Sequence, residues 1–181
     1  PIGLIGISFA TAAFPAFSRH FIQKEKEKFL EKFFSIFSQI LFLIIPLSFL
    51  IFLLRAQIVR LVLGTSIIGE GLFGWWQTRL TAACLGIFCI ALFANCLIPF
   101  LAKVFYSFHD TRTPVKIAIF SVILNIILCY SFVGFLSSPS FLQGEIISFL
   151  KLKGVQGVSV LGLPLALCIS SICQLFLLVS F

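Results

Sequence analysis

Charged side chains are scarce in this sequence. Only 10% of the 181 residues are Asp, Glu, Lys or Arg, whereas 60% are hydrophobic, and the mean hydropathy is +1.18. An ordinary soluble domain carries roughly 25% charged residues, so this composition excludes that class of protein. The formal net charge of +7 is spread along the edges of apolar runs rather than gathered on a soluble face, which argues against a nucleic-acid partner.

Residue types that carry catalysis and metal binding are also few. The two histidines, His20 and His109, lie outside the long apolar runs, and there is no His-Glu-x-x-His pattern, Gly-rich phosphate loop or nucleophile elbow. All six cysteines fall in apolar runs without a Cys-x-x-Cys pair, which predicts packing residues. We therefore predict neither an enzyme, nor a metal site, nor a cofactor.

Five long runs of residues carry no charge: 1–18, 33–54, 80–102, 117–144 and 154–181. Each is near or above the roughly 20 apolar residues that a helix needs to cross a bilayer. A chain in lipid must satisfy its own backbone hydrogen bonds, and these runs are too long for barrel strands. The sequence predicts an all-α, polytopic membrane protein with spans at about 1–18, 37–55, 80–103, 114–136 and 157–181.

Both ends of the chain lie in apolar runs. The sequence opens on Pro1, contains no Met, closes on Phe181, and neither end has a signal-peptide or transit-peptide pattern. We expect an internal piece of a longer, transporter-like chain.

The basic residues predict an orientation. Eight lie in 19–32 and 103–116, against five in the segments between the other pairs of spans. The positive-inside rule then places 19–32 and 103–116 in the cytoplasm. Trp75 and Trp76 beside Arg79 are expected to be interfacial anchors on the outer side.

Residues 20–36 have the pattern of an amphipathic helix. Phe29 and Phe33 are four positions apart, Phe37 continues this spacing just beyond the segment, and alternating Lys and Glu residues precede them at 24–28. We predict an interfacial helix before the second span. Its charged face is interpreted either as a site for anionic lipid head groups or as a solvated connector.

Proline and asparagine interrupt the apolar runs. Pro15, Pro46, Pro99 and Pro164 fit helices that bend around a transport cavity and fit ordinary packing equally well. Asn95 and Asn125 are candidate intramembrane polar sites, with hydrogen bonding between helices as the alternative role.

The polar segment 105–116, between the third and fourth spans, predicts a hinge at the membrane face. Asp110 suits the start of a tight turn, Thr113 suits a helix cap, and Pro114 suits a first helical turn. A plain turn with basic anchors is the alternative interpretation. The candidate hinge or cytoplasmic-gate residues are Lys103, Tyr106, Asp110, Thr111, Arg112, Thr113 and Pro114.

The order Phe-Tyr-x-x-x-Asp-Thr-x-Thr-Pro-Val-Lys at 105–116 resembles the signature joining the tenth and eleventh helices of the MurJ/MviN lipid II flippases. Further similarities follow in family order. They are 1–19 with the eighth helix, Ile45-Pro46-Leu47 with the ninth, 57–61 with the outer loop, 78–82 with the start of the tenth, 117–125 with the eleventh, and more loosely 157–181 with the twelfth.

This resemblance implies a two-lobe, fourteen-helix flippase of the multidrug/oligosaccharidyl-lipid/polysaccharide exporter superfamily, of which this chain supplies five helices of the second lobe. The implied function is translocation of lipid II across the bacterial cytoplasmic membrane by alternating access. The implied partners are lipid II, membrane lipids and the first lobe of the parent chain. Alternatives are an exporter of another lipid-linked oligosaccharide or a drug, and less favoured, an intramembrane enzyme or assembly protein.

The sequence also departs from the family pattern. Some members hold sodium partly with an asparagine and an aspartate on the eleventh helix and a threonine on the twelfth. Here Asn125 is present, but Cys129 and Cys168 occupy the other two positions, and sulfur is a poor sodium ligand. We predict no sodium coupling through this site. Residues 137–153 are longer than the usual link and are expected to form a short interfacial helix.

Overall fold

The structure, a computed structural model, describes residues 2–23, 25–63, 75–137 and 158–180. Its elements are the π-helix η1 (Ile2–Ile7), α1 (Ser8–Ile22), α2 (Lys26–Leu63), α3 (Trp75–Ser107), α4 (Arg112–Ser137), the 3-10 helix η2 (Val158–Leu161) and α6 (Gly162–Ser180). The described residues are almost all helical and include no strand. The predicted all-α fold is confirmed.

Five helical stretches are long and apolar enough to cross a membrane: Ile2–Phe21, Lys26–Val62, Gln77–Ser107, Arg112–Gly134 and Gly162–Ser180. They correspond in number and order to the five predicted spans. At 1.5 Å per residue the 38-residue α2 is about 57 Å long, nearly twice the thickness of a hydrocarbon core of about 30 Å. Part of α2 therefore extends beyond the hydrocarbon.

The second helix differs from the prediction. Instead of an interfacial helix at 20–36 and a separate span at 37–55, α1 continues to Ile22 and α2 runs from Lys26 to Leu63 as one helix. The buried side chains of Phe29, Ile36, Ile40 and Ile44 explain this difference. They form one stripe from the charged segment into the span, so the same helical face stays packed throughout.

Two predicted features lie outside the described part of the chain. The expected interfacial helix at 137–153 falls almost wholly in residues 138–157, and the side chains of Trp75 and Trp76 are likewise outside the description.

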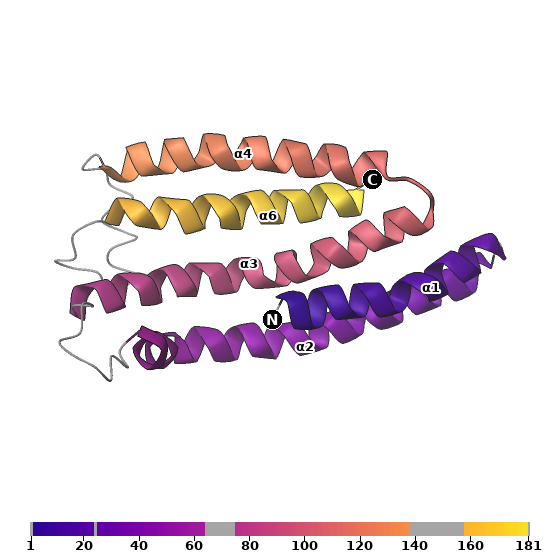
Figure 1. Ribbon diagram of the computed structural model, residues 1–181, viewed down its shortest axis with the longest axis horizontal. Coiled ribbons are helices and arrows are strands. Elements are labelled where there is room, and N and C mark those ends of the chain that lie inside the picture. The colour runs from indigo at the N-terminus through magenta and orange to yellow at the C-terminus, as the bar shows by residue number, and fades with distance from the viewer. Residues whose placement is uncertain (1, 24, 64–74, 138–157, 181) are drawn as a thin grey trace.

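The helices lie side by side with their long axes roughly parallel (Figure 1). Helix α3 is central, since it contacts η1, α1, α2 and α6, and α6 lies between α3 and α4. The α1–α2 turn and the α3–α4 loop share one end of the bundle, on the right in Figure 1. Segments 19–32 and 103–116 therefore lie on one side, as the distribution of basic residues predicted. We call this the basic end.

The packed core is aromatic near the basic end. Phe17, Phe100, Ile40 and Ile44 are fully buried where α1, α2 and α3 meet, and Leu161 begins a second cluster between α3 and α6. In contrast, only 11% of the apolar window of Arg112–Gly134 is buried, against 50% for Gln77–Ser107. Within the described residues, α4 therefore presents most of its apolar surface outward.

The prolines do not all act alike. Pro15, Pro46 and Pro99 lie inside α1, α2 and α3. Pro164 is the third residue of α6, where a helix needs no backbone donor. Of the two interpretations of the prolines, helix bending therefore does not apply to Pro164, which lies in the first turn of α6.

Candidate functional site

The C-terminus of α3 is closed by its own backbone. His109 N–H donates to the carbonyl of Tyr106 at 3.1 Å, and Asp110 N–H donates to that of Phe105 at 3.2 Å. This pair of bonds is a Schellman motif, which requires a left-handed residue after the helix. His109 supplies it with φ 59°, a conformation that histidine adopts more readily than most non-glycine residues. The loop therefore leaves α3 in a defined direction.

Asp110 begins the next helix. Its Oδ1 accepts the backbone N–H groups of Arg112 at 3.0 Å and Thr113 at 3.2 Å, while its Oδ2 accepts the Thr113 hydroxyl at 2.6 Å. The sequence favoured Thr113 as the cap, and this is corrected: Asp110 is the cap and Thr113 a donor to it. A carboxylate with two oxygens can accept all three bonds, which one hydroxyl cannot.

These bonds stabilise the ionised form of Asp110. The hydrogen bonds from Thr113 hold the pKa of the Asp110 carboxyl below its ordinary value, with further help from Arg112 and Lys116. Pro114 is the third residue of α4, within the first turn that the sequence assigned to it.

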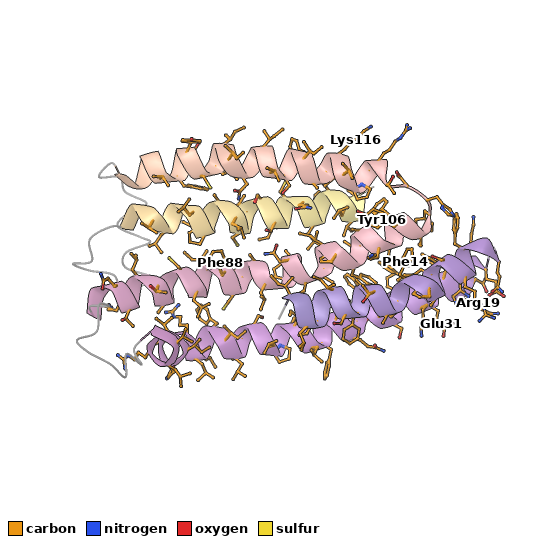
Figure 2. All side chains as sticks on the ribbon, viewed as in Figure 1. Phe14, Arg19, Glu31, Phe88, Tyr106 and Lys116 are labelled. Carbon is orange, nitrogen blue, oxygen red and sulfur yellow. The ribbon has the colours of Figure 1, made fainter. Side chains whose placement is uncertain are left out.

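The other predicted hinge residues lie around this loop. The Lys103 ammonium lies 5.4 Å from the ring centroid of Phe14 on α1 and 5.9 Å from that of Tyr106, within cation–π range. Thr111 and Arg112 are exposed. Figure 2 shows Tyr106 and Lys116 near the loop and Arg19 and Glu31 at the same end, with Phe88 farther along α3.

An aromatic cluster that was not predicted from the sequence joins the α3–α4 loop to the α1–α2 turn. The Phe108 ring lies 5.2 Å from that of Phe21 and 5.1 Å from that of Phe29. Phe17 continues the cluster into the core, 5.2 Å from Phe29 and 5.8 Å from Phe100. The four-residue spacing of Phe29 and Phe33 was visible in the sequence, but nothing in it identified Phe108 as a neighbour of Phe29.

The two predicted intramembrane asparagines lie in a polar layer centred on α6. Asn95 on α3 accepts a hydrogen bond from the Ser171 hydroxyl at 3.1 Å, and Asn125 on α4 donates to Ser170 at 3.0 Å. Both are bonds between helices, the role that sequence reasoning weighed as the alternative to a transport site. Ser170 and Ser171 were missed because serine in an apolar run is a weak signal.

One sulfur atom lies beside Asn125. The Cys129 thiol donates to the Asn125 side-chain oxygen at 3.7 Å, and Cys168 is buried nearby in chain order on α6. Among the described residues, no group of three His, Cys, Asp or Glu side chains could hold a metal ion. The absence of sodium coupling stays a prediction.

The side chain of Arg55 on α2 lies against α3. The Arg55 guanidinium stacks 4.8 Å from the centroid of Phe52, and its buried Nη1 has no hydrogen-bond partner among the described residues. Gly86 on α3 leaves room for this guanidinium, since a Cβ on residue 86 would lie 2.7 Å from the Arg55 Nη1.

Comparison with known proteins gives a consistent result. A family model described as lipid II flippase MurJ matches residues 1–181. The chain is 27% identical over 150 residues to a probable lipid II flippase MurJ of Borreliella burgdorferi, covering 83% of this chain and 29% of that protein. It is 33% identical over 129 residues to a probable lipid II flippase MurJ of Rickettsia prowazekii, covering 69% of this chain and 24% of that protein. No solved structure matches.

Proposed function

Because this chain belongs to the MurJ family of lipid II flippases, we propose that it is part of a flippase that moves lipid II across the cytoplasmic membrane by alternating access. The family match over all 181 residues carries this proposal. Family and apolar helices together make it a multi-pass protein of the bacterial inner membrane. The chain spans under a third of the length of the two curated relatives named above, so the proposed activity is that of the whole protein that contains it.

Physical chemistry supports a two-state transporter for such a substrate. A charged, sugar-bearing head group cannot cross hydrocarbon unaided, so protein must shield it during transit. The family is one of transporters rather than enzymes, and we propose that this chain contributes binding and motion without catalysis. Lipid II and membrane lipids are the proposed partners, together with the first lobe of the parent chain.

Within this function we propose that the α3–α4 loop is a stiff hinge, which holds α3 and α4 at a defined angle to each other. Three observations support the role. Helix α3 ends in the Schellman motif, and only Phe108 and His109 separate its last residue from Asp110, which caps α4. The loop is therefore short, and hydrogen bonds fix both of its ends. Helix α4 packs mainly on α6, which makes the loop its direct connection to α3. Lys103, Tyr106, Thr111 and Arg112 surround this connection as candidate gate residues.

Complementation tests the proposal. A bacterium depleted of its own lipid II flippase would express the full-length protein that contains this chain, and lipid II on the outer leaflet would be measured. We expect growth and exposure of lipid II to be restored. A well-expressed, membrane-inserted protein that restores neither would refute lipid II as the substrate and favour another lipid-linked oligosaccharide.

The hinge has its own test in the same cells. Replacing both Asp110 and Pro114 by Ala is expected to slow lipid II exposure at equal protein abundance, because the cap and the preset first turn are both lost. If the amount of lipid II on the outer leaflet is unchanged, the α3–α4 loop is an ordinary turn.

A further inference from the structure

Two adjoining cavities lie at the basic end, where α1 turns into α2. The first has a volume of about 670 Å³, and its surface is almost entirely apolar, with Phe21, Phe29, Leu30 and Phe108 in its wall. Its size falls within the roughly 300–1,000 Å³ typical of ligand sites. The second is about 290 Å³ and is more polar than apolar. It is lined by His20, Lys28, Glu31, Lys32 and Ser35. His20 is a lining residue of both cavities.

The charges around these cavities leave cations without carboxylate partners. Glu25 accepts Lys28 at 2.8 Å and contacts His20 Nδ1 at 3.2 Å, so its two oxygens are engaged. These bonds, with Lys28 first, hold the pKa of Glu25 below its ordinary value. Lys26 in the apolar cavity and Lys32 in the polar one form no ion pair within the described ranges.

The basic end as a whole has the same imbalance. Its described residues include seven Lys or Arg side chains against four carboxylates. The cations are Arg19, Lys26, Lys28, Lys32, Lys103, Arg112 and Lys116, and the carboxylates are Glu25, Glu27, Glu31 and Asp110. An excess of lysine beside an apolar cavity matches an amphipathic anion at the membrane interface.

We propose that the two cavities together bind one anionic phospholipid from the leaflet at the basic end. An acyl chain would occupy the apolar cavity, and the phosphate would lie by Lys26 and Lys32. A soluble anion would leave the apolar cavity unfilled, and a choline head group would bring a second cation toward the lysines. This proposal goes beyond the proposed function, since it requires no transport of lipid II.

Such a lipid would contact the hinge as well as the α1–α2 turn. Phe108 belongs to the α3–α4 loop and lines the apolar cavity together with Phe21 of α1 and Phe29 of α2. An occupant therefore bridges the α1–α2 turn and the α3–α4 loop, which the chain connects only through α2, α3 and the residues between them. Anionic lipid would favour the arrangement in which these segments are together.

Photolabelling tests this site directly. The purified full-length protein would be placed in phosphatidylcholine vesicles with phosphatidylglycerol carrying a diazirine in one acyl chain, and labelled peptides would be identified by mass spectrometry. We expect label on residues 20–36 and on the peptide containing Phe108. Unlabelled phosphatidylglycerol should compete for this label, whereas added phosphatidylcholine should not.

Variants test each part of the site. The double substitution Lys26→Gln and Lys32→Gln should weaken apparent affinity about 25-fold, since each lysine near an anionic lipid contributes a factor of about five. Leu30→Ser, at a side chain already half exposed, should reduce labelling through the apolar cavity alone. The matched control Arg19→Gln with Lys116→Gln removes the same charge from the same end, and neither residue lines either of these two cavities.

Several outcomes would overturn the proposal. If a phosphatidylcholine probe labels the site equally, the site has no preference for anionic lipid. If the control variant loses as much labelling as the variant with Lys26→Gln and Lys32→Gln, the effect is one of general surface charge. Label confined to other peptides would mean that another part of the parent protein covers the cavities. Competition by lipid II alone would assign the site to the transport substrate. A protein that complements a flippase-depleted cell but is not labelled refutes this site and leaves the proposed function standing.

Discussion

The contact between η1 and α3 yields a prediction whose magnitude follows from the structure. A Cβ placed on Gly6 would lie 2.7 Å from the carbonyl oxygen of Cys96 and 3.0 Å from its Cα. Both are backbone atoms of the fully buried residue Cys96, so no side chain can rotate away. To reach ordinary contact at 3.4 Å the two backbones must separate by about 0.7 Å, which loosens packing along the whole contact.

Gly3 provides the matched control, because a Cβ there has nothing within 4 Å and it lies in the same π-helix. Both Gly→Ala changes gain similar helix propensity, so comparing them removes that contribution. Over-packing typically costs about 1–3 kcal/mol, and we expect Gly6→Ala to be less stable than Gly3→Ala by this amount. Gly86→Ala should fall between them, since its Cβ would meet the movable Arg55 side chain.

The assay is the free energy of unfolding of the full-length protein, measured by titration with sodium dodecyl sulfate in mixed micelles. Growth of flippase-depleted cells expressing each variant gives a second readout. If Gly6→Ala and Gly3→Ala are equally stable, η1 and α3 do not pack backbone against backbone, and the reasoning fails.

Three further predictions use the same unfolding assay. Asn125→Ala should cost about 0.6 kcal/mol, and less than about 1.7, because Ser170 keeps its bond to the Leu167 carbonyl; a larger loss would indicate a different role. Phe17→Ala should cost about 3–5 kcal/mol, while Phe176→Ala, which is 71% exposed, should cost far less. The lowered pKa of Asp110 means that its stabilising effect is complete above the ordinary carboxyl value and is lost as pH falls through the lowered one. The advantage of the native protein over Asp110→Asn should therefore shrink below about pH 4, and a constant difference would contradict this assignment.

The local features of the α3–α4 loop were predictable because they depend on neighbouring residues. Asp110, Thr113 and Pro114 all lie within five positions, and capping needs no distant partner. The choice between Asp110 and Thr113 as the cap was not predictable, since both residue types cap helices. The backbone path after His109 decided it by placing the Asp110 carboxylate against the first N–H groups of α4.

The sequence by itself determined that the chain is helical, that it has five spans and that its basic segments share one end, because hydropathy and helix length are sums over consecutive residues. Only the tertiary structure decided that Ser170 faces Asn125 and Ser171 faces Asn95, pairs separated by 45 and 76 positions. It also decided that Phe108 meets Phe21, and that α2 continues without a break. These contacts depend on which helices are neighbours and on how each is rotated, and that arrangement is set by packing of the whole bundle at once.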